Sequence, residues 1–425
     1  MVSTGIAFSS RDARKEVAPN PGGVVKERAP TKGLSQTSYM GRVDMQDARP
    51  EGAERPRVLA GLFGAGLLIS SIVYPIARYA GSYFPAISLL AAVLATPVVW
   101  RRHGRIARVW SLFLLLGVLS LSWTRDIALT ESALVAFVCT GLPALASGVL
   151  LKSRALGLTL CAGMFSSAMI ISATTGLYNI NTYAKMILLG CLSACVVLSR
   201  YHRRLVRLLI PVLLIAYIPT MLTSDSAQAA VAWSVAILVW TVWGIRKMFW
   251  TNRPALASLL TALLLFGVLL LSTQNVIWGR SIADSTSDTG RTLIWETLLS
   301  SCESGSCIVG NGLGTIVAVS SSLGLGLSQA HNIFVLCLME LGVVGVGVIG
   351  LLLLSVVRPV LSLTSPAFPA VVLAAIVWVA SSDLMNVADS FVLSLLLAIG
   401  SHIESGSERS RRVGPRGVRI STRKW

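Results

Sequence analysis

The sequence predicts an all-α polytopic membrane protein, and its composition and the spacing of its apolar runs both indicate this fold. Hydrophobic residues make up 54% of the chain and charged residues only 13%, whereas a soluble domain carries about 25% charged residues. Apolar runs of roughly 15–22 residues follow one another from residue 58 to residue 403, and about 20 apolar residues cross a bilayer core as a helix. No strand-like alternation of polar and apolar residues interrupts them.

We expect about twelve transmembrane helices, joined by short links except for one large outer loop between the ninth and tenth. The expected spans are residues 58–77, 86–100, 109–123, 133–151, 156–174, 186–198, 208–222, 229–243, 255–271, 331–354, 366–381 and 389–403. The large loop covers residues 272–330, and long connections are usually functional or disordered. Its own apolar content, including a short helix predicted from Thr292, favours an ordered cap over the helices.

The net charge of +17 is a signal of membrane topology. Residues 1–57 hold ten Lys and Arg, residues 404–425 hold seven, and alternate short links hold fourteen. The opposite set of links holds five: Arg78, Arg125, Lys185, Arg280 and Arg291. This bias follows the positive-inside rule and predicts that both termini are cytosolic. It disfavours a nucleic-acid partner.

The sequence predicts a tail at each end of the chain, outside the transmembrane domain of residues 58–403. Residues 1–57 mix Pro, Gly, Ser and both signs of charge and contain no apolar segment of a signal peptide. This composition is typical of a disordered cytosolic tail. Residues 404–425 form a basic cytosolic tail that anionic membrane lipids attract.

His331 is the strongest candidate for catalysis. It opens an apolar helix directly after the large loop, and the other three histidines lie in segments predicted to be cytosolic. A neutral imidazole at this position can accept a proton from a substrate hydroxyl. The pattern leaves open a second interpretation, in which His331 only begins the helix and its neighbour Asn332 caps it.

Three arginines on the outer side are candidate anion ligands: Arg125, Arg280 and Arg291. Guanidinium groups stay charged and bind phosphate through paired hydrogen bonds, so converging arginines match a diphosphate. Ion pairs with neighbouring acids are the alternative. The candidate pairs are Arg125 with Asp126, Arg280 with Asp284, and Arg291 with Asp288 or Glu296.

Glu340 lies nine residues after His331, about 13 Å along a helix and half a rotation away from it. An ionisable group at that depth should face the protein interior, and we expect a structural or supporting role for it.

The two cysteines of the outer loop, Cys302 and Cys307, are close enough in sequence for a disulfide that would stiffen the turn before Gly310. One outer-side histidine argues against a multi-histidine metal site. Paired acidic residues near the ends of spans are also missing, which disfavours metal-assisted glycosyl transfer. We therefore expect no metal and no cofactor.

Three ordered blocks over about 55 residues resemble the O-antigen ligase/polymerase family of integral membrane glycosyltransferases. The blocks read GRTLIW at residues 290–295, GNGLG at 310–314, and AHNIF at 330–334 followed by ELGVVG at 340–345. Their glycines include Gly310, Gly312, Gly314, Gly342 and Gly345, for which we expect a structural role. The early outer segment around Trp123 and Arg125 is similar to that family as well.

The resemblance implies a metal-independent, inverting glycosyl transfer at the outer face of the bacterial plasma (inner) membrane. A polyprenyl-diphosphate-linked glycan is the implied donor, and a glycan or lipid hydroxyl is the implied acceptor. His331 corresponds to the essential histidine of the family, and Arg291 and Arg280 to its loop arginines. Ligases and polymerases share these blocks, so the resemblance does not choose between them.

Two other functions remain alternatives: a twelve-span secondary transporter, and a non-catalytic scaffold for assembly of the cell envelope. A transporter commonly carries its large loop between two halves of the chain and its ionisable groups near the middle of the membrane. Here the large loop follows the ninth span, and Glu340 is the one strongly charged residue expected deep in a span.

Overall fold

The part of the chain that the structure describes is built from helices alone. The computed structural model describes residues 55–77, 84–101, 104–175, 180–201, 209–223, 227–249, 291–301, 306–324, 332–361, 363, 365–381 and 390–412. Its α-helices are α1 (Arg55–Ala77), α2 (Phe84–Arg101), α3 (Arg105–Leu119), α4 (Ile127–Leu150), α5 (Ser153–Thr175), α6 (Ile180–Ser199), α8 (Leu209–Ala216), α9 (Ile218–Thr223), α10 (Ala227–Phe249), α14 (Arg291–Ser300), α15 (Ser306–Val309), α16 (Ile316–Ser322), α17 (Ile333–Leu361), α18 (Ala367–Ser381) and α19 (Ser390–Arg412). All of them belong to one compact unit, Glu51–Trp425.

Six of the described helices are long and apolar enough to cross a membrane. These candidate spans are Arg57–Pro75, Arg105–Ser122, Ile127–Leu150, Ser153–Ala173, Thr182–Ser199 and Ile333–Leu361. Shorter apolar helices lie in five other expected ranges, at Ala86–Arg101, Leu209–Met221, Ala229–Trp243, Ala367–Val379 and Ser390–Gly406. The expected span at 255–271 lies outside the described residues, as do most of the two predicted tails. The architecture is that of an α-helical membrane protein.

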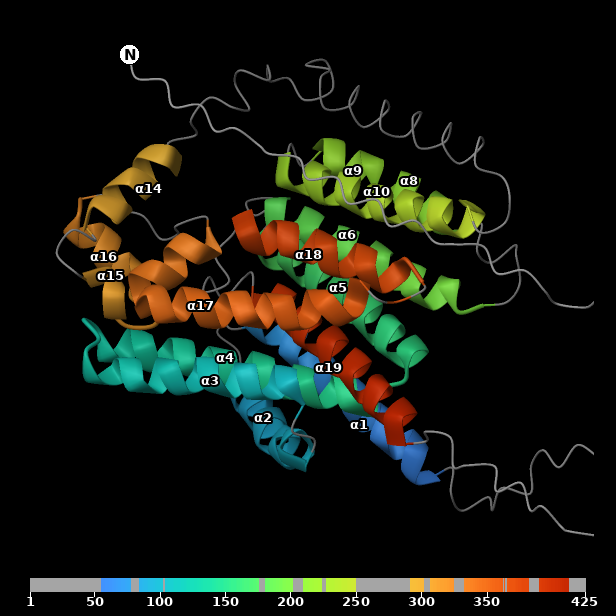
Figure 1. Ribbon diagram of the computed structural model, residues 1–425, viewed down its shortest axis with the longest axis horizontal. Coiled ribbons are helices and arrows are strands. Elements are labelled where there is room, and N and C mark those ends of the chain that lie inside the picture. The colour runs from blue at the N-terminus through green and yellow to red at the C-terminus, as the bar shows by residue number, and fades with distance from the viewer. Residues whose placement is uncertain are drawn as a thin grey trace, which may run out of the picture. The chain divides into compact units, whose positions relative to one another are not determined.

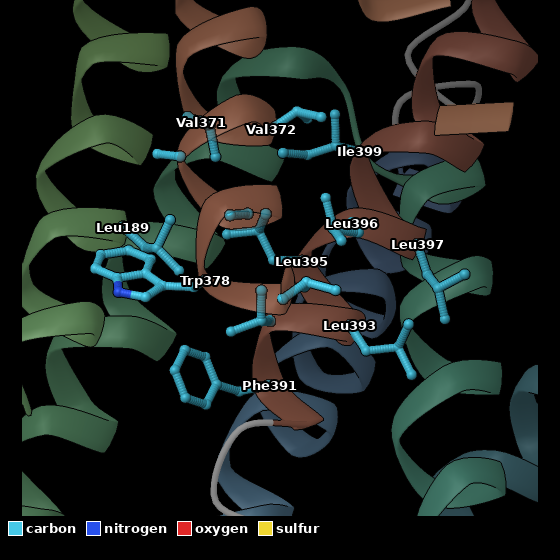
Figure 2. Close-up of a cluster of buried hydrophobic side chains, with 14 of the residues drawn as sticks. Leu189, Val371, Val372, Trp378, Phe391, Leu393, Leu395, Leu396, Leu397 and Ile399 are labelled. Atoms are coloured by element: carbon cyan, nitrogen blue, oxygen red, sulfur yellow. The ribbon is translucent and has the colours of Figure 1, made fainter. Parts of the chain in front are cut away.

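Helix α19 is the centre of the described bundle (Figure 1). It packs against α1, α3, α4, α5, α17 and α18, and its residues 390–401 are buried. Figure 2 shows Leu189 of α6 beside Trp378 of α18, in a cluster of buried side chains that also includes Phe391 of α19. Between helices in a membrane, close packing of this kind replaces the hydrophobic effect as the main stabilising term.

Small residues let α4 and α19 approach closely. A Cβ atom at Gly148 of α4 would overlap the backbone carbonyl oxygen of Ala398 in α19. One turn away, the hydroxyl of Ser401 donates to the carbonyl oxygen of Leu145 at 2.9 Å. Glycine and serine at such contacts are typical of helix pairs in membranes.

The expected span at 208–222 is divided into α8 and α9. Pro219 has no N–H to donate to the carbonyl of Ile215, so the helix cannot continue through it unchanged. Tyr217, at the division, is fully buried and donates its hydroxyl to the Ala184 carbonyl oxygen at 3.1 Å. Trp233 of α10 donates to the Leu214 carbonyl oxygen at 3.0 Å. Neighbouring helices therefore stabilise the division.

Exposed cations gather at one end of the helices, which we call the basic end. Its described members are Arg57, Arg101, Arg105, Arg108, Lys152, Arg154, Arg200 and Arg358. Side chains join the helices there: the carboxylate of Glu404 in α19 accepts from the backbone N–H groups that begin α3, and Ser153 of α5 hydrogen-bonds to His402 at 2.8 Å. The chain segments α14, α15 and α16 lie at the opposite end, beside the start of α17 (Figure 1).

We predict that Gly148→Ala lowers the stability of the fold while Gly66→Ala does not. The new methyl group at residue 148 must push α4 away from α19, and overpacking costs about 1–3 kcal/mol. Gly66 lies in α1, and a Cβ there meets no atom within 4 Å. Thermal unfolding of both variants in the same detergent checks the prediction. Equal midpoints would contradict the close contact between α4 and α19.

Candidate functional site

The site is built around a turn, residues 310–315, that is hydrogen-bonded into a break in α17. The N–H of Asn311 donates to the carbonyl oxygen of Met339 at 2.9 Å, and the N–H of Gly312 donates to that of Glu340 at 2.8 Å. In an unbroken helix these two carbonyls would accept from the N–H groups four residues later. The side-chain amide of Asn311 adds a second bond to Met339, at 2.8 Å. We call these residues the interlock: 310–315 and 339–342.

Glycine makes the interlock sterically possible. Gly342 has a φ of 68° and a ψ of −167°, a conformation outside the helical range that divides α17 into two halves. A Cβ atom at Gly342 would overlap the Ile308 carbonyl oxygen, and one at Gly310 would overlap the backbone of Glu340. Gly312 and Gly314 also have positive φ, at 106° and 78°. Residues with a Cβ are disfavoured here for two reasons: the positive φ is unfavourable for them, and the Cβ would overlap neighbouring atoms.

Glu340 holds the next element of the loop in place. Its side chain is fully buried, and its Oε1 accepts from the N–H of Ile316, the first residue of α16, at 3.0 Å. The hydroxyl of Thr315, which precedes α16, donates to the Gly312 carbonyl at 2.6 Å and does not cap the helix. A carboxylate satisfies the unpaired N–H groups of a helix start and favours its dipole. Glu340 therefore ties α16 to α17.

The corner between α3 and α4 contacts the same turn and presents Arg125. The N–H of Arg125 donates to the Asn311 carbonyl at 3.1 Å, and the N–H of Leu313 donates to the hydroxyl of Ser120 at 3.2 Å. The Arg125 side chain is exposed and makes no ion pair within the described part of the chain. Asp126 caps α4 instead, accepting from the N–H of Leu129 at 3.0 Å. The structure therefore does not contain the alternative ion pair between Arg125 and Asp126.

Helix α17 begins at Ile333, two residues after the predicted histidine. Asn332 caps it, with its side-chain oxygen 2.8 Å from the N–H of Phe334 and 3.3 Å from that of Val335. His331 itself lies outside the described residues, as does Arg280. Arg291 begins α14, but its side chain is not among those described. The structure thus joins Arg125, Glu340 and the glycine turn.

The expected disulfide falls partly outside the described residues. Cys307 is disulfide-bonded, and its sulfur lies 3.8 Å from the sulfur of Met339 beside the interlock. Cys302 is not among the described residues. Five other cysteines, at 139, 161, 191, 195 and 337, are not disulfide-bonded. Among the described side chains, no three His, Cys, Asp or Glu residues come together as a metal site.

Lys185 does not lie in an outer link, contrary to our sequence interpretation. It belongs to α6 and is only 4% exposed. Helix α6 begins at Ile180, before the expected start at residue 186, because lysine and its neighbours are compatible with a helix and only the apolar run was visible in the sequence. A lysine buried in a candidate span is a functional candidate that sequence reasoning missed. Lys185 directly precedes the apolar run that begins at Met186, and this position was the sequence signal that it could belong to the span.

Comparison of the chain with protein-family models and with curated proteins gives no match.

We predict that Gly342→Ala opens the interlock, whereas Gly347→Ala does not. Alanine at residue 342 combines a positive φ, which costs roughly 1–2 kcal/mol, with overlap of the Ile308 carbonyl. Gly347 lies in the same helix, and a Cβ there meets no atom within 4 Å. Hydrogen exchange of residues 310–316 measures the effect. We expect faster exchange only in the Gly342 variant, and unchanged exchange there would refute the proposed steric role.

Proposed function

We propose that this chain is a glycosyltransferase similar to O-antigen ligases and polymerases. The donor is a glycan linked to polyprenyl diphosphate, and the acceptor is a hydroxyl group of a second glycan or of a lipid. The observation that carries the proposal is the interlock: the GNGLG turn and the ELGVVG helix, two of the three blocks that resemble this family, form one hydrogen-bonded unit. An exposed arginine from a third, distant segment lies at the same turn.

The proposal includes a topology of twelve spans in the plasma membrane of a bacterium, with residues 255–271 as the ninth. Both tails then lie in the cytosol, and the loop at 272–330 lies outside. Six candidate spans and five shorter apolar helices support this arrangement. The gathering of exposed cations at the basic end supports the orientation, since positive residues favour the cytosolic side. The interlock then lies toward the outer side.

In the proposed reaction, the acceptor hydroxyl oxygen attacks the anomeric carbon of the donor from the side opposite to the diphosphate. The bond from that carbon to the diphosphate oxygen breaks, and the lipid diphosphate leaves with the electron pair. His331 takes the proton of the hydroxyl as general base. Arg125, Arg280 and Arg291 stabilise the negative charge that develops on the leaving diphosphate. The reaction inverts the configuration at the anomeric carbon.

A second candidate function, secondary transport, draws support from the same break in α17. Transporters often use broken helices whose freed carbonyls bind the transported ion or substrate. Here, however, the carbonyls of Met339 and Glu340 accept hydrogen bonds from the glycine turn. We therefore favour the enzyme. Product formation in detergent, where no gradient exists, separates the two functions.

We predict that His331→Ala lowers the turnover of glycan transfer by at least about 100-fold, because general bases contribute roughly 10²–10⁴-fold. The assay uses purified protein, a polyprenyl-diphosphate-linked glycan and an acceptor, with His402→Gln as a matched histidine control at the basic end. Wild-type turnover in the His331 variant would refute the assignment. Absence of transfer by the wild-type protein, combined with uptake in proteoliposomes, would favour the transporter.

We expect Arg125→Ala to raise the KM for the donor by about tenfold, since hydrogen bonds to a charged group contribute about 1.5–3 kcal/mol. Arg108→Ala is the control, because Arg108 is also an exposed arginine but lies at the basic end of α3. The same KM in both variants would exclude Arg125 from donor binding. The His331 measurement would stand regardless of that result.

A further inference from the structure

Helix α15 exposes apolar side chains although it is not part of any candidate span. Ile308 is 68% exposed and Val309 is 52% exposed, while Cys307 and Leu313 on either side of them are buried. A loop segment in water would normally present polar groups there. Large exposed apolar residues that cluster mark a surface for a lipid, a membrane or another protein.

The exposed residues of α15 lie directly beside the break in α17. The carbonyl of Ile308 and the backbone of Val309 are next to Gly342. The two residues that follow Gly342 are also exposed apolar residues, Val343 at 61% and Val344 at 59%. We call these four side chains, Ile308, Val309, Val343 and Val344, the boundary patch.

The length of α17 gives the distance of the boundary patch from the basic end. From Gly342, α17 continues for sixteen residues to Arg358 at the basic end, which is about 24 Å at 1.5 Å per residue. The hydrocarbon core of a bilayer is about 30 Å thick. If Arg358 lies at the cytosolic boundary, the patch lies within the outer part of the hydrocarbon and is in contact with lipid chains.

A cation lies across the same turn from the patch. Asn311 joins the two sides, because its N–H donates to Met339 of α17 and its carbonyl accepts from Arg125. The exposed guanidinium of Arg125 makes no ion pair among the described residues. A positive group beside an apolar surface at the membrane boundary is complementary to an amphiphile with an anionic head and a long apolar chain.

We propose that the boundary patch binds the polyprenyl chain of the lipid-linked donor, next to the diphosphate. This inference rests on the proposed glycosyl transfer and assigns the lipid-binding part of the site. The chain lies along Ile308, Val309, Val343 and Val344, and Arg125 binds the diphosphate at its end. Contact with ordinary bilayer lipid does not require α15 to be held beside α17. A substrate lipid, in contrast, must be positioned next to its reacting diphosphate.

Photolabelling tests the inference without requiring transfer. The probe is a polyprenyl diphosphate that carries a benzophenone in its isoprenoid chain, with the full-length protein in nanodiscs. We expect adducts within residues 306–311 and 342–345, and about tenfold less labelling in the double variant Ile308→Ser/Val309→Ser. The matched control is Leu112→Ser/Leu115→Ser, because these residues of α3 are also exposed and apolar. Thermal unfolding of each variant shows whether it is folded.

The possible results separate the lipid site from the proposed function. Labelling of the patch without any transfer would overturn the glycosyltransferase and leave the lipid site standing. Transfer with labelling that the Ile308/Val309 variant does not change would overturn the inference alone. Equal labelling by a benzophenone phosphatidylglycerol would also overturn it, because the patch would then contact bulk lipid. If the inference holds, the double variant also raises the KM for the donor and leaves kcat unchanged.

Discussion

At the break in α17, two hydrogen bonds from the glycine turn replace two backbone hydrogen bonds of the helix. The outer end of this protein depends on this replacement. A helix that is interrupted near hydrocarbon exposes carbonyl groups that water cannot reach, and each unsatisfied group costs several kcal/mol. Asn311 and Gly312 remove that cost by donating to Met339 and Glu340. The break and the turn are therefore stable only together. A change that removes one leaves the polar groups of the other exposed to an apolar environment.

The bonds between the turn and α17 bring several separate segments of the chain together at the turn. The turn is held on its other side by the corner between α3 and α4, through the Arg125 N–H and the Ser120 hydroxyl. Glu340 extends the connection to α16 by capping its first residue. Sequence segments that lie about 200 residues apart are thus joined by backbone and side-chain bonds at one turn. Arg125 gains a fixed backbone position while its side chain remains exposed.

The sequence located a helix in eleven of the twelve expected ranges, because long apolar runs have a direct physical meaning in a membrane. It also identified Asn332 as a residue suited to the helix start, since capping depends on local residue type. The break at Gly342 could not be predicted in this way. A glycine inside an apolar run is compatible with an ordinary helix, and the partner that breaks it lies 30 residues earlier. Pairing between distant segments leaves no local pattern.

Contacts between distant segments also explain why the partner of Glu340 and the burial of Lys185 could not be predicted. Glu340 was expected to face the interior, but its partner at Ile316 depends on how the loop folds back onto α17. Lys185 was assigned to a link because a positive charge next to an apolar run usually marks the end of a span. Its burial depends on neighbouring helices, which pack around α6. The predicted residues His331 and Arg280 lie outside the described part of the chain, so their roles stay predictions.

The first half of α17 connects the interlock to the proposed catalytic residue. Asn332 fixes the start of this half, and the turn fixes its end at Met339 and Glu340. A short helix that is held at both ends has little freedom to rotate or slide. His331 directly precedes Asn332 in the sequence. A general base must be held in a defined geometry, and the interlock gives this helix a physical reason to be rigid. The glycines of the turn would then serve catalysis without contacting any substrate.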